Sequence, residues 1–462
     1  MLGKLWAVAR VTIAQGIRMK VALVIVFFLL AVVPALPFLL RTDGTQLGQV
    51  RIVVTYSLYL AMFLLSILTL LVSTTSISKE IEQKQIFVLD PKPLGRWQIF
   101  VGKWIGIMTL NAILIALLGI AAYILMMALS RPGDNEKEFE DLRNNFLISR
   151  ENVTPDLPQD LGRLVDAEYE SRREQQLLPE DRAEIWVKQK LVPIVARRLN
   201  SVEPLTYKMW TFSGLPTNLP PDTKIQFRFM HNVTSRNQPD DGILGQWQLG
   251  DPNGVNYEFK QVSPYDGYHT VEVPADAIAP DGTMAAAYTN LRASQPLVIF
   301  PFEDGIRISY PVGSLEANYL KALLVIFLML GMLALVGLVC GALLSFPVAI
   351  LVVLAVFCIG VGAVFLSAQI QGTYFFGPEL RQPGAAFNVG DQILQGVLQF
   401  VLFLFPPLLE YSPVSMVSDA QSISWVFVLK TLVELLLFRG GVVAVIGAFL
   451  FHRRELGTAS VQ

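Results

Sequence analysis

Charged residues and cysteines are both scarce in this 462-residue chain. Charged side chains make up 16% of it, against roughly 25% in a soluble domain, while 53% of its residues are hydrophobic. Its two cysteines, Cys340 and Cys358, both lie in apolar runs, which is typical of inert packing residues. Because the hydrophobic residues are also concentrated in runs, the composition indicates a membrane protein rather than a soluble one.

Signatures of catalysis and of metal or nucleic-acid binding are missing as well. No stretch fits the G-x-x-x-x-G-K-[ST] phosphate-binding loop, so we do not expect the chain to hydrolyse ATP by itself. The histidines His231, His269 and His452 have no metal-ligand spacing, and the first two are expected at the surface of strands. The net charge is −2 and there is no basic tract, so we do not expect the chain to bind nucleic acid. The sequence thus predicts a protein that is not an enzyme and binds no metal or other cofactor itself.

Six apolar runs are long enough to cross a bilayer, since a spanning helix needs about 20 apolar residues. These runs are 21–40, 52–72, 104–129, 322–344, 347–366 and 425–451. A further run, 393–405, is shorter and ends at Pro406-Pro407, which favours a re-entrant or interfacial helix. The predicted fold is an α-helical polytopic membrane protein with six transmembrane helices and an inserted extracytoplasmic α+β domain.

The distribution of Lys and Arg predicts the orientation, because short cytoplasmic loops are enriched in both. They gather in residues 1–20, in residues 76–103 and after the last run. Six spans place all three segments, and so both termini, in the cytoplasm, and leave residues 131–318 outside. For residues 1–20 we favour an interfacial helix with Trp6 as its anchor over a solvated basic lead-in.

Residues 131–318 form the predicted extracytoplasmic domain. Its first part, 131–203, has the charge pattern of helices. Its second part, 204–312, contains period-two segments such as Ile225–Phe229 and repeated Asp-Gly turns. Short strands with frequent turns predict a β-sandwich-like fold for this part.

The loop between the second and third spans, residues 76–103, is larger and more charged than a simple connection needs. Ser78 is placed to cap a helix that carries Glu80 and Glu82 in its first turn, with Glu80 and Lys84 as an i,i+4 pair. Ile77, Ile81 and Phe87 give this helix an apolar stripe. The residues alone fit two alternatives: a helix gripped by a cytosolic partner, or an interfacial loop with snorkelling lysines.

Two segments of this loop resemble the cytoplasmic loop of ABC-2 type ABC transporter permeases. The first is EIEQKQ at 80–85, and the second is PLGRWQIFVGK at 93–103. The tail FHRREL at 451–456 is similar to the usual ending of that family. The resemblance covers residues 1–130 and 319–462, whereas 131–318 stands where most members have a short external loop. Gln83 departs from the family pattern, which has Gly or Arg at this position.

The resemblance implies a half-transporter with transmembrane helices 1–3 in residues 21–130 and helices 4–6 in 319–462. Such a permease pairs with a second permease subunit and binds a cytosolic ABC ATPase, which uses ATP and Mg to drive transport, mostly export, across the cell inner membrane. The residues that it implies for ATPase coupling are Ser78, Lys79, Glu80, Glu82, Gln83, Lys84, Phe87, Arg96 and Trp97. Residues 91–103 would be the hinge that carries the motion into the third span.

Polar residues inside the spans are a second set of candidates, because charge is expensive there. Lys430 and Glu434 lie one turn apart and can pair, or they can lie at the outer interface. Arg439 is too deep to reach the surface and is expected to face protein or water. Asn111 is expected to hydrogen-bond a neighbouring helix.

Two other functions fit the composition. The chain can be a membrane-anchored binding or assembly module, in which residues 131–318 hold a glycan or a periplasmic protein and the spans only bind membrane lipid. A secondary transporter is less favoured, because the sequence has no inverted repeat and few acidic residues in its spans.

Overall fold

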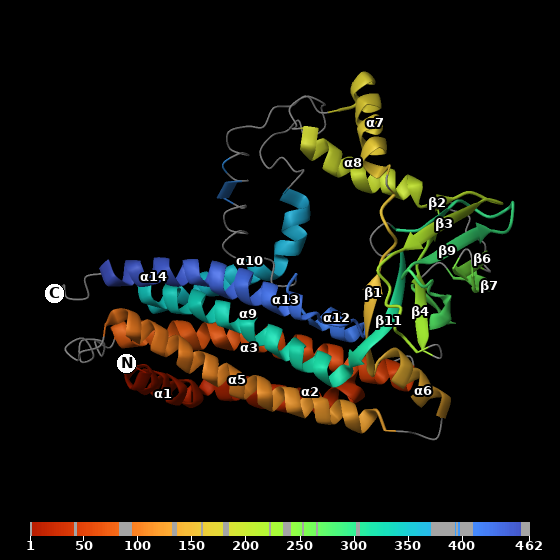
Figure 1. The fold of residues 1–462 in the computed structure, drawn as a ribbon. Helices are drawn as coiled ribbons and strands as arrows, with labels where there is room; N and C mark the ends of the chain where they lie inside the picture. The colour runs from red at the N-terminus through yellow and green to blue at the C-terminus, as the bar shows by residue number, and fades with distance from the viewer. Residues whose placement is uncertain are drawn as a thin grey trace. The chain divides into compact units, whose positions relative to one another are not determined.

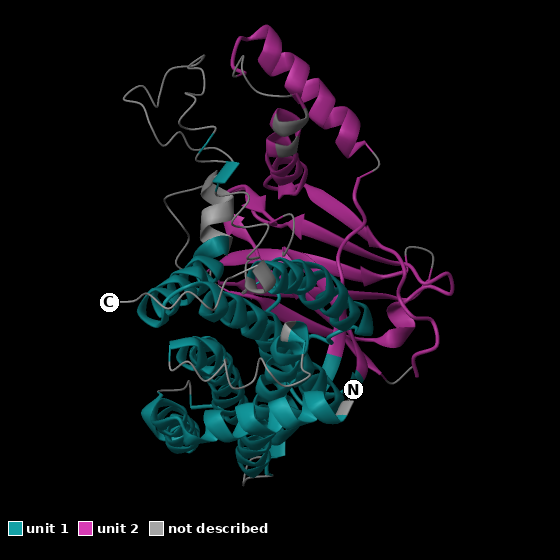
Figure 2. Cartoon of the chain, turned by 90° about the vertical axis from the view of Figure 1, so that its left-hand side faces the viewer, with its two compact units in different colours: residues 1–149, 313–375, 389–462 teal, residues 150–312, 376–388 magenta. Residues whose placement is uncertain are grey.

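The fold consists of two compact units, coloured separately in Figure 2. Unit 1 comprises residues 1–149, 313–375 and 389–462, and unit 2 comprises 150–312 and 376–388. The structure, a computed structural model, describes residues 2–40, 44–82, 95–131, 136–158, 160–178, 184–220, 223–233, 242–251, 254–264, 267–301, 305–370, 393, 396–397 and 410–453. Most of the predicted short helix 393–405 lies outside these residues.

Unit 1 is helical (Figure 1). Its elements are α1 (Leu2–Arg18), α2 (Lys20–Leu39), α3 (Gln46–Glu82), α5 (Arg96–Leu129), α6 (Glu136–Asn145), α9 (Leu315–Leu343), α10 (Phe346–Ile370), α12 (Val414–Ser418), α13 (Trp425–Lys430), the π-helix η2 (Thr431–Gly440) and α14 (Gly441–Arg453). Among the described residues, six helices are long and apolar enough to span a membrane: Lys20–Leu39, Gln46–Glu82, Trp97–Leu129, Leu315–Leu343, Phe346–Ala363 and Trp425–Leu450. The prediction of six spans is confirmed.

Two of these helices, α3 and α9, form the buried centre of unit 1, and the others are largely exposed. They approach closely because α9 presents glycines where α3 presents small polar side chains. A β-carbon added at Gly341 would lie 2.5 Å from the carbonyl oxygen of Thr74, and Gly337 lies against Ser73. Small residues at such positions let helix backbones approach each other in a membrane protein.

The segment that leads into the last span is held on α9 and α3 by polar side chains. Asn318, on α9, donates to the carbonyl oxygen of Gln421 (2.8 Å) and accepts from the backbone N–H of Ile423 (2.7 Å). Arg51, on α3, forms an ion pair with Asp419. The two hydrogen bonds of Asn318 satisfy backbone groups in the segment between α12 and α13, and the ion pair holds the start of that segment on α3.

Unit 2 contains two helices and most of the strands. They are β1 (Ile148–Val153), α7 (Leu161–Glu174), α8 (Glu184–Leu199), β2 (Ser201–Val202), β3 (Tyr207–Phe212), β4 (Lys224–Phe229), β5 (Asn232–Val233), β6 (Ile243–Gly250), β7 (Asn256–Ser263), β8 (His269–Pro274), the short η1 (Ala275–Ala277), β9 (Met284–Asn290), β10 (Val298–Ile299) and β11 (Ile306–Ser314). The strands form sheets of order β1-β11-β4-β8, β3-β9-β6-β7 and β2-β10-β5. The registers given by the described pairs are antiparallel, for example Phe227 opposite Ile308 and Trp247 opposite Tyr288.

An aromatic core joins the two four-stranded sheets. The ring of Phe227, on β4, lies 4.6 Å from that of Trp247, on β6, measured between centroids. Phe229 and Tyr288 pack on the same tryptophan at 4.9 Å and 4.8 Å. Alternate residues of each strand point into this core, which is how the period-two pattern arises. The prediction of a sandwich-like β-rich part is confirmed.

The first part of the predicted external domain differs from the expectation of helices alone. Residues 148–153 form strand β1, because they pair with β11 at the far end of the segment. The compact unit begins at residue 150, and α6 belongs to unit 1, where Leu142 and Phe146 are buried in the helical core. Such a pairing between the two ends of a segment cannot be read from local periodicity.

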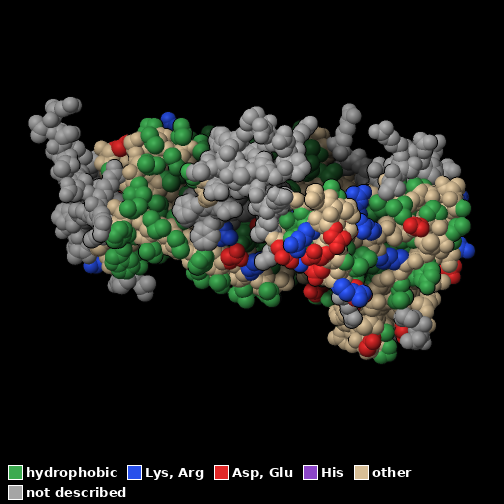
Figure 3. All heavy atoms as spheres, turned by 90° about the horizontal axis from the view of Figure 1, so that it is seen from above, with side chains coloured by type: hydrophobic (Ala, Val, Ile, Leu, Met, Phe, Trp, Pro, Cys, Tyr) green, Lys and Arg blue, Asp and Glu red, His purple; other side chains and the backbone are tan. Residues whose placement is uncertain are grey.

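The helices α7 and α8 form a hairpin with a small apolar core of its own. Glu168, on α7, accepts hydrogen bonds from Arg172 (2.8 Å) and from Arg198 of α8 (3.0 Å). Figure 3 shows acidic and basic side chains gathered over this hairpin, in contrast to the apolar side chains on the visible face of unit 1. The hairpin is therefore solvated on its outer side.

His231 is buried rather than exposed, which corrects the expectation of a surface histidine. It is 2% exposed and its ring lies 5.7 Å from that of His269 and 6.2 Å from that of Phe229. Burial, with a smaller contribution from His269, lowers the pKa of His231 to about 4. The pairing of β4 with β8 places Phe229 opposite His269, and His231 follows shortly after β4, so these rings meet in a way that spacing along the chain does not show.

This lowered pKa predicts that acid destabilises unit 2. The unfolded chain binds a proton near pH 6.5 and the folded chain only near pH 4, so stability is present above pH 6.5 and falls as the pH drops between these values. A full shift corresponds to about 3 kcal/mol. Thermal unfolding of the full chain between pH 7 and 4 tests this, and His231→Phe should flatten the dependence. An equally steep dependence in His231→Phe would contradict it.

Candidate coupling site

Helices α3 and α5 extend beyond the thickness of a membrane at the end where residues 76–103 connect them. α3 has 37 residues and α5 has 34. At 1.5 Å per residue these helices are about 50–55 Å long, compared with about 30 Å for the hydrocarbon core. Both helices are therefore longer than the hydrocarbon core is thick, and their polar ends, residues 73–82 and 96–103, adjoin the loop that joins them.

The second span and the start of the loop form one continuous helix. α3 runs unbroken through Glu82, so Ser78 lies in the body of a helix. The prediction that Ser78 caps a new helix is wrong. The predicted residues Gln83, Lys84 and Phe87 and the hinge up to residue 94 lie outside the described residues, as does the tail after 453.

A buried ion pair links α3 to α5. Lys103 Nζ donates to Glu80 Oε1 (2.8 Å) and to the carbonyl oxygen of Ser76 (2.7 Å). The side chains of Lys103 and Glu80 are 3% and 8% exposed. Gln15, on α1, donates to the same Glu80 oxygen at 3.1 Å. Glu80 therefore pairs with Lys103, whereas the predicted Glu80–Lys84 pair includes a residue outside the described ones. Ser78 and Glu80 are buried against their own chain.

The last turn of α3 also contacts the start of α10. Glu82 Oε1 accepts a hydrogen bond from the backbone N–H of Phe346 at 3.1 Å, and Lys79 Nζ lies 5.4 Å from the centre of the Phe346 ring. A carboxylate at a helix N-terminus satisfies a free N–H and interacts favourably with the helix dipole. Lys79, Glu82 and Trp97 remain exposed at this end of the bundle, whereas the side chain of Arg96 lies outside the description.

Helix α1 packs against the rest of the bundle, and the prediction of an interfacial helix did not include this contact. Leu5, Ala9 and Thr12 of α1 are buried, and Trp6 is 56% exposed. α1 packs on α5 at two glycines, because a β-carbon at Gly106 would lie 2.6 Å from the carbonyl oxygen of Ala9. The Gly102-Lys-Trp-Ile-Gly106 spacing in the sequence was the available signal, since G-x-x-x-G favours close helix contacts.

The polar residues within the spans form two contacts. Asn111 is 1% exposed and accepts a hydrogen bond from Thr69 of α3 at 3.1 Å, so it links two helices. Arg439 donates to Glu434 at 3.4 Å. Glu434 therefore pairs with Arg439 and not with Lys430. The reason is that residues 431–440 form a π-helix, in which hydrogen bonds from i to i+5 bring residues five apart onto one side.

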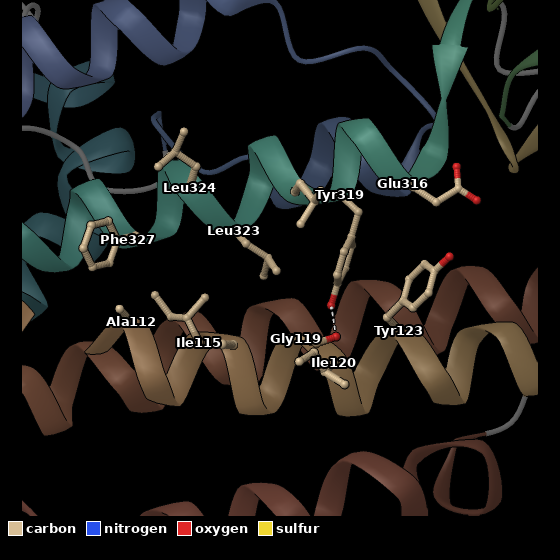
Figure 4. Close-up of a pocket in the computed structure, with 12 residues that line it drawn as sticks. Ala112, Ile115, Gly119, Ile120, Tyr123, Glu316, Tyr319, Leu323, Leu324 and Phe327 are labelled. Carbon is tan, nitrogen blue, oxygen red and sulfur yellow. Dashed lines mark hydrogen bonds between the residues drawn. The ribbon is translucent and has the colours of Figure 1, made fainter. Parts of the chain in front are cut away.

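An apolar groove of about 490 Å³ lies between α5 and α9 (Figure 4). Ile115, Leu323 and Phe327 line it, and Glu316 is at one end near Tyr123. The hydroxyl of Tyr319 donates across the groove to the carbonyl oxygen of Gly119 at 3.0 Å. Side chains of this kind suit contact with lipid tails or with an apolar helix.

Comparison with known proteins agrees with this architecture. Residues 6–149 match the family model described as ABC-2 family transporter protein. This match supports membership of the ABC-2 permease family and covers residues 6–149 of the 462. The match includes α3, the start of α5 and the Glu80–Lys103 pair, and it ends where unit 2 begins. No curated protein matches the chain.

The family match and the six apolar helices together support the coarse function. The chain is a multi-pass membrane protein and a permease component of an ABC transporter. Permeases of this family are the membrane subunits, not the catalytic ones, and the family implies an ABC ATPase partner and a dimer. Among the described residues, no group of three or more histidine, cysteine or acidic side chains is placed to hold a metal ion.

Proposed function

We propose that this permease exports a cargo across the inner membrane, driven by a separate cytosolic ABC ATPase that docks where α3 ends and α5 begins. The observation that carries the proposal is the length of both helices, which exceeds the hydrocarbon core, together with the exposure of Lys79, Glu82 and Trp97 at the ends that the loop joins. ATP and Mg are used by that ATPase. Both termini and residues 76–103 then lie in the cytoplasm, and unit 2 lies outside.

The buried ion pair gives this docking site a mechanical connection. A displacement of the α3 end moves Glu80, and the ion pair with Lys103 transmits it to α5. The hydrogen bond from Gln15 carries the same displacement to α1. A second permease subunit completes the path for the cargo between two such bundles.

Unit 2 is the proposed determinant of specificity, for a glycan or for a periplasmic protein. Unit 2 lies outside the residues that match the family model. Its strand β3 presents an exposed apolar surface, in which Tyr207 is 75% and Met209 55% exposed. Aromatic and methionine side chains are enriched in recognition surfaces. Deleting residues 150–312 should abolish the selection of cargo and leave the association with the ATPase intact.

Replacing exposed residues of the docking site tests the proposal. We expect Glu82→Gln with Trp97→Ala to reduce co-purification of the ABC ATPase at least tenfold, because a tryptophan that becomes buried in an interface commonly contributes about 2 kcal/mol or more. Lys430→Gln with Trp425→Ala, exposed residues of the last span, is the matched control. Unchanged binding in the first variant, with transport retained, would rule out docking at this end of α3.

A further inference from the structure

A cavity of about 530 Å³ lies where α1 turns into α2 and both meet α3. This volume is in the range of small-molecule and cofactor sites, roughly 300–1,000 Å³. Met19 forms the turn, in extended conformation between the two helices. The cavity belongs entirely to unit 1 and is separate from the groove between α5 and α9.

The rim of this cavity is basic. Arg18, Lys20 and Lys79 line it, and all three are exposed. Glu80 is the sole acidic residue of the described lining, and it is already paired with Lys103. Lys79 also lies over the ring of Phe346, which leaves its ammonium hydrogens available. The charge of the lining therefore favours an anion.

Two buried acceptors lie in the same wall. Glu80 Oε2 and Gln15 Oε1 have no hydrogen-bond partner, although both atoms are inaccessible to water. The Glu80 residue is 6% exposed. Buried polar atoms are rarely left unpaired, so this wall suits a ligand that brings hydrogen-bond donors.

The apolar part of the lining distinguishes a lipid from a free ion. Val21 and Val72 line the cavity, and the outer face of α2 continues from it as an apolar surface, with Val24 66% and Phe27 76% exposed. A free phosphate ion would make no favourable contact with this apolar surface. A phospholipid fills it with an acyl chain, while its phosphate reaches the basic rim.

We propose that this cavity binds one anionic phospholipid whose headgroup carries hydroxyl groups, as phosphatidylglycerol does. The phosphate pairs with Arg18, Lys20 and Lys79, and the hydroxyls donate to Gln15 and Glu80. Basic pockets between membrane helices bind anionic headgroups in this way, at about 1 kcal/mol for each Lys or Arg. The bound lipid joins α1, α2 and α3 at the base of the proposed ATPase site.

The test measures lipid binding to the purified full chain without any ATPase, so it is independent of the proposed function. Native mass spectrometry compares phosphatidylglycerol, phosphatidic acid, phosphatidylcholine and inorganic phosphate. We expect Arg18→Gln with Lys20→Gln to weaken phosphatidylglycerol binding roughly 30-fold. Lys4→Gln with Arg10→Gln removes two charges from α1 outside the cavity lining and should change the binding less than threefold.

The remaining outcomes also decide the proposal. Gln15→Leu should reduce the preference for phosphatidylglycerol over phosphatidic acid, because the latter has no headgroup hydroxyls. Equal weakening by the two charge variants would show diffuse attraction instead of a site. Binding of phosphatidylcholine as tight as that of phosphatidylglycerol, or displacement of the lipid by inorganic phosphate, would overturn the proposal.

Discussion

Replacement of Glu80 by glutamine is expected to destabilise unit 1 by about 3–5 kcal/mol. Glutamine keeps the shape of the side chain but removes the charge, so Lys103 remains buried beside a neutral group. Lys103 is 2% exposed, and its ammonium group donates to Glu80 and to the carbonyl oxygen of Ser76. Breaking a buried ion pair costs more than the pair contributes, because the remaining charge has lost its compensation.

Thermal unfolding of the purified full chain in detergent measures this effect. Glu82→Gln is the matched control, since it removes the same charge from an exposed position of the same helix. The double variant Glu80→Met with Lys103→Met should recover most of the stability, because it removes both charges and keeps the volume. If Glu80→Gln unfolds at the same temperature as the unchanged chain, the ion pair does not hold α3 and α5 together.

The ion pair could not be found from the sequence because the end of α3 was misread. Residues 73–78 are rich in Ser and Thr, a composition that favours loops and caps. They are nevertheless helical and buried, since the glycines of α9 leave room for small polar side chains beside them. Once this tract is helical, Glu80 faces Lys103 across the bundle, at a distance of 23 residues along the chain.

The six spans, by contrast, follow from local composition, so length and hydropathy alone predicted them. The π-helix in the last span has no such local signal, and in it Glu434 pairs with Arg439. A Lys430–Glu434 pair was one of two alternatives that the sequence allowed. Strand β1 was missed for a related reason, because its partner β11 lies at the other end of unit 2. Local periodicity predicts elements, whereas pairing between distant segments decides which polar residues meet.

Substitution of Gly106 by alanine is expected to release α1 from α5. The added β-carbon would lie 2.6 Å from the carbonyl oxygen of Ala9 and 2.9 Å from the β-carbon of Thr12, so backbone must move. Overpacking of this kind costs about 1–3 kcal/mol. The displacement would also separate Gln15 from Glu80, which adds the loss of a hydrogen bond to a charged group, about 1.5–3 kcal/mol.

Gly441→Ala is the matched control, because a β-carbon there meets no atom within 4 Å. In that helix alanine should be neutral or stabilise by up to about 1 kcal/mol, through its higher helix propensity. Limited proteolysis near the N-terminus and thermal unfolding distinguish the two variants. Faster cleavage of α1 and a lower unfolding temperature are expected for Gly106→Ala alone. Equal behaviour of the two variants would mean that the glycine contact does not fix α1, and that the link from Glu80 to α1 is not needed to hold the bundle.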